Sequence, residues 1–91
     1  MSYIQILRDA DERSLLADTV TLPRTDPVYE VVQVLLEARG IDLPDTSEVW
    51  DVHVDENEPA DVCVWILDAD GNDVRHVFTF EEINAVEAQV V

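Results

Sequence analysis

Lysine is absent from this chain, and arginine alone supplies its five basic residues. A nucleic-acid groove needs clustered Lys and Arg to displace counterions from phosphates, so this scarcity argues against a nucleic-acid partner. Cys63 is the single cysteine, which excludes an internal disulfide and suits a reducing cytosol. No apolar run approaches the ~20 residues that span a bilayer, so we expect no membrane segment.

Glycine and proline are scarce too, with two and four residues, and this excludes flexible linkers and low-complexity repeats. Hydrophobic residues nonetheless make up 47% of the chain, which is too many for a disordered acidic polymer. A length of 91 residues suits one domain with one core. No basic stretch precedes an apolar one at the N-terminus, so we predict no export signal and a single cytoplasmic domain over residues 1–91.

Acidic residues are the most abundant feature of the sequence. Twenty-one Asp and Glu give a formal net charge of −16, and they are spread along the chain instead of gathered in a tail. Residues 42–91 contain fourteen of these acids and one basic residue, Arg75. This acid-rich, lysine-free composition resembles that of small cytosolic proteins of haloarchaea. The resemblance implies a surface adapted to molar salt and identifies no functional family.

A helix is predicted from Pro27 to Arg39. Asp26 is a favourable N-cap, and proline is tolerated at the first helical position because its missing N–H would be unpaired there. Gly40 can adopt the left-handed conformation that ends a helix. Between these ends an apolar stripe recurs at helical spacing. It consists of Val28, Val31, Val32, Leu35 and Leu36.

Three strands are predicted after this helix. Hydrophobic alternation indicates strands over about 49–55 and 74–80, while residues 62–67 are apolar on both faces, as in a central strand. Asp70-Gly71 is a residue pair favoured in a two-residue type I′ hairpin turn. Thr79 and Glu82 have the spacing of a capping box, which predicts a C-terminal helix over about 80–89. The expected fold is α+β: a three-stranded antiparallel meander, with the 27–39 helix on one face.

The first 25 residues leave alternatives open. Ile4 and Ile6 alternate as in a strand, whereas Asp9 and Glu12 have capping-box spacing and favour a helix behind them. We expect a short strand or turn, then a short helix over 10–18, then an extended stretch that includes residues 19–22.

The predicted turn at 70–71 sets which residues share a sheet face. It pairs Trp65 with His76, and the first hairpin pairs Cys63 with His53. One face then contains Asp51, His53, Asp55, Cys63, Trp65, His76 and Phe78. The other, nearly all aliphatic, should pack against the 27–39 helix. It contains Trp50, Val52, Val54, Val62, Val64, Ile66 and Val77, with Arg75 and Thr79 at its edge.

His53, Cys63 and His76 are candidate ligands for one zinc ion, because cross-strand neighbours lie ~5 Å apart. The chain has neither a Cys-x-x-Cys nor a His-x-x-x-His spacing, however, so we predict no metal site and no cofactor. Cys63 lies in mid-strand among apolar residues, which is unlike a reactive cysteine. No phosphate-binding glycine loop and no nucleophile elbow are present. We therefore predict that the protein is not an enzyme.

The remaining hypothesis is a non-catalytic interaction or regulatory module. Its predicted interaction face consists of His53, Cys63, Trp65, His76 and Phe78, and its partner is a second copy of the chain or another protein. The alternative is a winged-helix-like nucleic-acid-binding protein, since a helix with a β-hairpin is common to that class. The scarcity of basic residues counts against the alternative.

Salt should stabilise the folded chain. At a net charge of −16, repulsion between surface carboxylates opposes compaction. We expect the melting temperature to rise as KCl increases from about 0.1 M to about 2 M, first by screening and then by strengthened apolar burial. Thermal unfolding followed by circular dichroism measures this effect. A melting temperature that stays flat across the series would show that the composition is not a salt adaptation.

Overall fold

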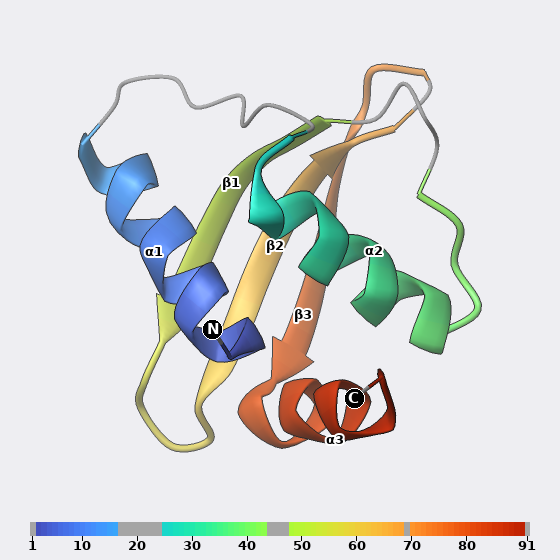
Figure 1. Ribbon diagram of the computed structural model, residues 1–91. Coiled ribbons are helices and arrows are strands. Elements are labelled where there is room, and N and C mark those ends of the chain that lie inside the picture. Colours follow the sequence, from blue (N-terminus) through green and yellow to red (C-terminus); the bar gives the residue numbers. More distant parts are fainter. Residues whose placement is uncertain (1, 17–24, 44–47, 69, 91) are drawn as a thin grey trace.

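A computed structural model describes residues 2–16, 25–43, 48–68 and 70–90. The elements in chain order are α1 (Tyr3–Leu16), α2 (Pro27–Ala38), β1 (Glu48–Asp55), β2 (Asp61–Leu67), β3 (Asp73–Thr79) and α3 (Phe80–Val90). The strands form one antiparallel sheet in the order β1-β2-β3 (Figure 1). The predicted α+β meander and its two helices are therefore confirmed, with ends that agree within about a residue.

The helices form a layer on one side of the sheet. Helices α1 and α2 lie in front of the strands, and α3 closes the end of this layer below β3 (Figure 1). The central strand turns Val62, Val64 and Ile66 toward the helices, and all three are buried. They belong to one hydrophobic core that includes residues from every helix and strand. Among the described residues, no helix is long and apolar enough to cross a membrane.

Helix α2 begins and ends as its sequence predicts. Asp26 is the N-cap, and its Oδ1 accepts a hydrogen bond from the N–H of Val28 at 3.1 Å. Gly40 has a φ of +76°, and its N–H donates to the carbonyl of Glu37 at 2.9 Å. The N–H of Ile41 donates to the carbonyl of Leu36 at 2.9 Å, which completes a Schellman motif.

Helix α1 begins earlier than predicted. We expected a strand or turn around Ile4 and Ile6, and this is wrong because α1 starts at Tyr3. Helical spacing brings Leu7 and Ala10 to one side, where both are fully buried. Packing against β1, α2 and α3 thus outweighs the local β pattern.

The N-cap of α1 was also misassigned. Ser2 takes that role, and its Oγ accepts the N–H of Gln5 at 3.1 Å. Asp9 and Glu12, the predicted capping box, lie inside the helix. We predicted a helix over 10–18, and α1 does cover this range as far as Leu16. Residues 17 and 18, and the extended stretch predicted at 19–22, lie outside the described residues.

The register is confirmed in the first hairpin and wrong by one residue in the second. His53 pairs with Cys63 as predicted, but Trp65 pairs with Arg75 and Cys63 with Val77. The reason is a longer turn, closed by a hydrogen bond from the N–H of Asp68 to the carbonyl of Asn72 at 2.9 Å. Gly71 has a φ of +83° and donates its N–H to the carbonyl of Asp68 at 3.0 Å. This geometry matches a turn that ends in a left-handed glycine, not a two-residue type I′ turn.

The side chain of Asp68 fixes this longer turn. Its Oδ1 accepts the N–H groups of Asp70 and Asn72 at 2.9 and 2.8 Å. A one-residue slip moves every side chain of a strand to the other face. His76 and Phe78 therefore lie on the helix side of β3, and Arg75, Val77 and Thr79 lie on the opposite side.

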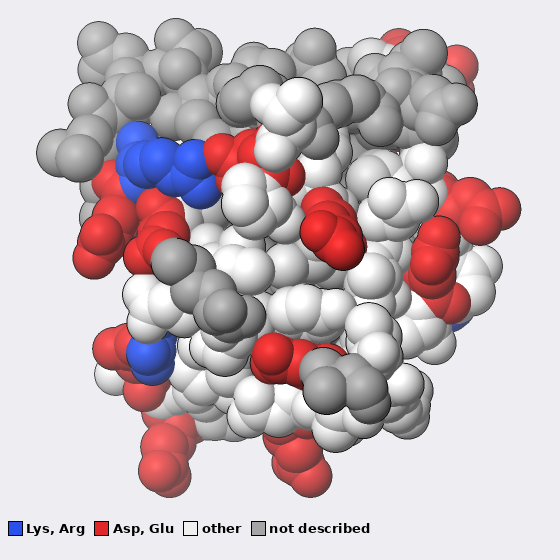
Figure 2. Space-filling view, in the orientation of Figure 1, with Lys and Arg blue, Asp and Glu red and all other residues white. Residues whose placement is uncertain are grey.

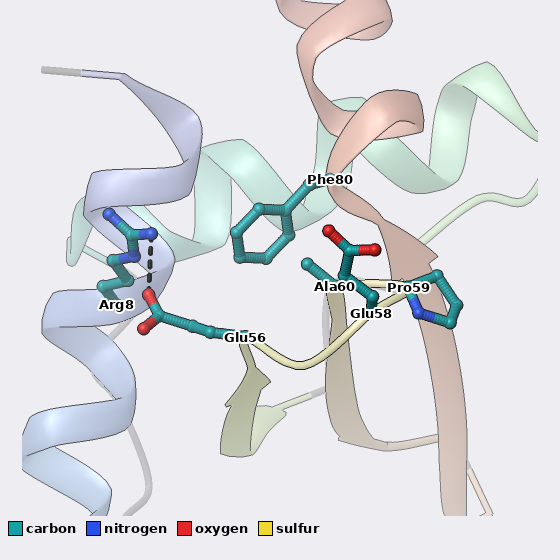
Figure 3. A pocket seen from close by; sticks show the side chains of 6 residues that line it. All are labelled: Arg8, Glu56, Glu58, Pro59, Ala60 and Phe80. Carbon is teal, nitrogen blue, oxygen red and sulfur yellow. Dashed lines mark ion pairs between the residues drawn. The ribbon is translucent and has the colours of Figure 1, made fainter.

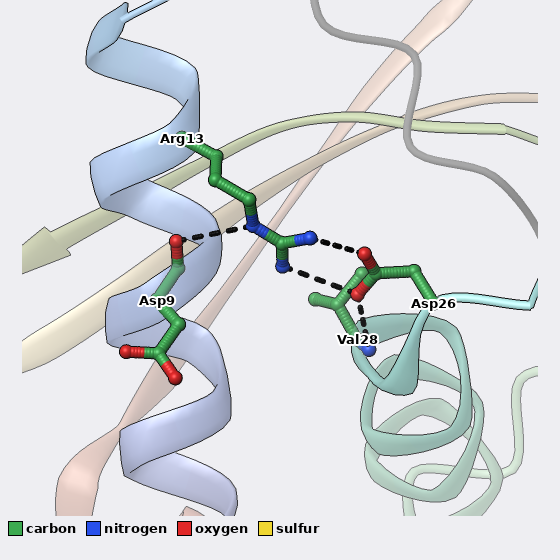
Figure 4. A network of polar contacts seen from close by, with 4 residues as sticks. All are labelled: Asp9, Arg13, Asp26 and Val28. Atoms are coloured by element: carbon green, nitrogen blue, oxygen red, sulfur yellow. Dashed lines mark hydrogen bonds and ion pairs between the residues drawn. The ribbon is translucent and has the colours of Figure 1, made fainter.

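Three arginines, Arg8, Arg13 and Arg39, form ion pairs that join separate segments of the chain. The side of the molecule drawn in Figure 2 has many more acidic than basic side chains. Arg8 of α1 pairs with Glu56, in the loop after β1, at 2.6 Å and lies over the ring of Phe80, 5.7 Å from its centroid (Figure 3). Arg13 binds both carboxylate oxygens of Asp26, which links α1 to the start of α2 (Figure 4). This contact lowers the pKa of Asp26.

Arg39 makes the corresponding contact at the other end of α2. Its Nε and Nη2 donate to the two carboxylate oxygens of Glu82 in α3, at 2.8 and 2.7 Å. Nη2 also donates to the carbonyl of Val77 in β3 at 2.6 Å, and the guanidinium lies 4.1 Å from the ring centroid of Phe78. The predicted cap at Thr79 is present, since its Oγ1 accepts the N–H of Glu82 at 3.1 Å.

Tyr29 is a core residue that the apolar stripe did not identify. It is 5% exposed, and its hydroxyl accepts the N–H of Val49 at 2.9 Å, beside an irregularity in the β1–β2 pairing between Val49 and Asp51. The hydroxyl thus satisfies a buried backbone donor where the ladder is interrupted.

Replacing this hydroxyl should destabilise the fold. In Tyr29→Phe the N–H of Val49 loses its partner, and we expect the free energy of unfolding to fall by about 1–2 kcal/mol. Denaturant unfolding at molar KCl measures the change. Tyr3→Phe is the matched control, because the hydroxyl of half-buried Tyr3 makes no hydrogen bond within the described residues. Equal losses in both variants would contradict a specific role for Tyr29.

Candidate interaction surface

The face of the sheet that points away from the helices is covered by no described element. We call it the open sheet face. Cross-strand rows build it, since paired residues in adjacent strands share a side. Three rows form its middle and its loop end: Asp51, Trp65 and Arg75; His53, Cys63 and Val77; and Asp55, Asp61 and Thr79. A further row, at the turn end of β2 and β3, contains Leu67 and Asp73.

The middle of the open sheet face is apolar. Cys63 and Trp65 of β2 are half-buried, and Val77 of β3 is 39% exposed. A shallow groove of about 550 Å³ runs over these residues and their neighbours on β1 and β3. The guanidinium of Arg75 lies 6.0 Å from the ring centroid of Trp65, at the limit of a cation–π contact.

The β1 side of the open sheet face is acidic. Asp51 and Asp55 lie on the same side of β1, and Asp61 of β2 is directly opposite Asp55. Asp55 accepts hydrogen bonds from the backbone and side chain of Asn57 at 3.0 and 2.7 Å. None of the three aspartates forms an ion pair with another described residue. Like charges directly opposite in a sheet repel each other, so the Asp55–Asp61 pair destabilises the folded protein.

Only part of the predicted interaction face is brought together. His53, Cys63 and Trp65 share the open sheet face as expected. The placement of His76 and Phe78 beside them is wrong: Phe78 is fully buried in the core, and His76 is half-buried on the helix side. Val77, Arg75 and Thr79 were predicted on the helix side of the sheet, and they lie on the open sheet face instead. The sequence did contain a signal for the correct register. Asp68 can accept backbone N–H groups of the residues that follow it, and this favours the longer turn.

The same register separates the three candidate metal ligands. His76 is on the opposite side of the sheet from His53 and Cys63, so the three do not converge. Across the part of the chain that the structure describes, no three His, Cys, Asp or Glu residues are grouped to hold a metal ion. Burial raises the pKa of the Cys63 thiol, with Asp51 and Asp61 adding to the effect and Arg75 opposing it. A thiol that stays protonated at neutral pH is a poor nucleophile.

A second hollow lies where α1, the β1–β2 loop and the start of α3 meet (Figure 3). It has a volume of about 770 Å³ and is lined by Arg8, Glu56, Glu58, Pro59, Ala60 and Phe80. The Glu58–Pro59 peptide bond in this loop is cis. Arg8 already pairs with Glu56 and lies over Phe80, so these two charged groups serve an internal contact, whereas Glu58 forms no ion pair with another described residue.

Comparison of the chain with protein-family models, with curated proteins and with solved structures gave no match. Any function therefore has to be inferred from the residues of the open sheet face themselves.

The half-buried position of His76 makes the stability of the fold pH-dependent. Burial lowers the pKa of His76, and the nearby charge of Arg39 lowers it further. A histidine whose pKa is lower in the folded state contributes stability above its unfolded pKa of about 6.5, and this is lost as the pH falls through the folded value. We expect the free energy of unfolding at molar KCl to decrease as the pH falls from about 7.5 to about 5.5.

Two variants test this assignment. His76→Gln cannot gain a proton and should flatten the pH dependence in that range. Asn84→Gln is the control, since Asn84 is an exposed residue of α3 and neither side chain titrates, and it should keep the slope of the parent protein. An unchanged slope in His76→Gln, measured by denaturant unfolding at each pH, would refute the role of His76.

Proposed function

We propose that this protein is a non-catalytic interaction module that acts through the open sheet face. The observation that carries the proposal is an apolar centre, Cys63, Trp65 and Val77, on a side of the sheet that none of the described helices covers. Apolar surface on a sheet is stable when another layer covers it, and surfaces left open in a monomer are frequent binding sites.

The chemistry of the face supports binding over catalysis. The raised pKa of Cys63 disfavours a thiolate nucleophile, and the candidate ligands do not converge. The apolar centre with a charged margin instead has the composition of a protein interface, where a buried centre is surrounded by polar residues.

The setting we propose for this module is a salt-rich cytoplasm. A net charge of −16 without a single lysine fits a surface that must stay hydrated at molar salt. The nucleic-acid-binding alternative gains no support from the described arginines. Arg8, Arg13 and Arg39 pair with carboxylates of the chain itself, and Arg75 lies beside Trp65.

Site-specific cross-linking tests this function. A photo-reactive phenylalanine derivative replaces Val77 at the centre of the open sheet face, and the protein is irradiated in its native cells. We expect a discrete covalent adduct, because the bound partner should contact this position. The mass of the adduct relative to the 10.3 kDa chain distinguishes a second copy from another protein.

The matched control places the same photo-reactive group at Glu30, an exposed residue of α2 on the helix side. This position should give no discrete adduct. The same products from both positions, or none from Val77, would show that the open sheet face is not the site of interaction.

A further inference from the structure

The charges of the open sheet face determine which partner it can accept. The groove is lined by three aspartates, Asp51, Asp55 and Asp61, against one arginine, Arg75. All three carboxylates lie on β1 or at the start of β2, and Arg75 lies on β3 at the far side. The groove is therefore acidic along the β1 side of its apolar centre.

A second copy of the chain fits this face poorly. A two-fold dimer would press the same face against itself, which brings six aspartates together with two arginines. Even if each Arg75 paired with one carboxylate, four carboxylates would remain without a cationic partner. Desolvating such like charges is costly, and a phosphate backbone would add to the repulsion. A partner that supplies positive charge removes this cost.

The spacing of the acidic residues matches an extended chain. Asp51, His53 and Asp55 alternate along β1, so their side chains project at intervals of ~6.8 Å. A peptide in extended conformation presents side chains on one side at the same interval. Basic residues at its first and fifth positions would lie ~13.6 Å apart, which matches the separation of Asp51 from Asp55. An apolar third residue would then lie over Cys63.

The Asp55–Asp61 pair is the strongest reason to expect a cation. The two residues are directly opposite on neighbouring strands, and neither forms an ion pair within the described part of the chain. A guanidinium can donate to two carboxylates at once through its planar fork, whereas an ammonium has no such fixed geometry. An arginine placed between Asp55 and Asp61 would turn a repulsive pair into a bidentate contact.

We propose that the open sheet face binds an extended cationic segment of another protein, with two arginines four residues apart and an apolar residue midway between them. This inference rests on the proposed function and names the chemistry of its partner. The arginines pair with Asp51 at one end and with Asp55 and Asp61 at the other, and the apolar residue packs on Cys63.

A short peptide tests the proposal. The probe is a peptide blocked at both ends, Gly-Arg-Thr-Val-Thr-Arg-Gly, titrated into isotope-labelled protein at about 1 M KCl, where long-range attraction is screened. We expect amide chemical shifts to change at Cys63, Trp65 and Val77 and to stay constant in α2. The same peptide with citrulline in place of both arginines has nearly the same shape without the charge, and it should not bind. Equal binding of the two peptides would overturn the proposal.

Two variants with the same net charge separate a specific contact from general attraction. Asp51→Asn/Asp55→Asn/Asp61→Asn neutralises the acidic side of the face, and we expect it to weaken peptide binding about tenfold. The Asn side chain at position 55 keeps an acceptor for the bonds from Asn57. Glu30→Gln/Glu37→Gln/Glu81→Gln removes three exposed acids from α2 and α3 and should leave the affinity unchanged. Equal weakening by both variants would overturn the proposal.

The remaining outcomes distinguish a failure of this inference from a failure of the proposed function. If no cationic peptide binds but the cross-linker at Val77 still gives an adduct, the face is an interface and the arginine chemistry is wrong. An adduct of twice the 10.3 kDa chain mass would identify a second copy as the occupant and likewise overturn the inference. Failure of the Val77 cross-link overturns both.

Discussion

The helical layer depends on the contact between α2 and the sheet. Six residues of α2 are buried, and they share one core with the inward-facing side chains of β2. The residues that end this helix also fix its position. Asp26 caps the first turn and binds Arg13 of α1, and Arg39 follows the last turn and binds β3 and α3. Position and length of α2 are thus set by the same side chains.

The chain has only five basic residues, and arginine suits the contacts that join its elements. Each guanidinium can bind two acceptors in a fixed plane, so a few residues can join several elements. Arg13 lowers the pKa of Asp26 and Arg39 lowers that of Glu82, so both carboxylates favour the ionised form in the fold. Their stabilising effect is present above the usual carboxyl pKa and is lost as the pH falls below it. With 21 acids against five arginines, most acids of the chain have no cation to bind.

Sequence patterns predicted best where one local signal decides the structure. The caps at Asp26 and Gly40 set the ends of α2 without help from distant residues. The first part of helix α1 was not predicted because Leu7 and Ala10 are buried by elements far along the chain, a contact that local alternation cannot reveal. In the second hairpin, a glycine after Asp70 suits both a two-residue turn and a longer one, and the carboxylate of Asp68 selects the longer.

That single residue of register decides the chemistry of the open sheet face. With the shorter turn, His76 and Phe78 would lie beside Cys63. The face would then be aromatic, and the three candidate metal ligands would lie close together. With the observed turn, Val77 and Arg75 take those places, and His76 and Phe78 serve the core and its contact with Arg39. At molar salt the Debye length shrinks to about 3 Å, so distant charges hardly attract. A surface in such a medium must recognise its partner by direct contact. An apolar centre beside carboxylates that form no ion pair with another described residue provides both apolar and charged contacts.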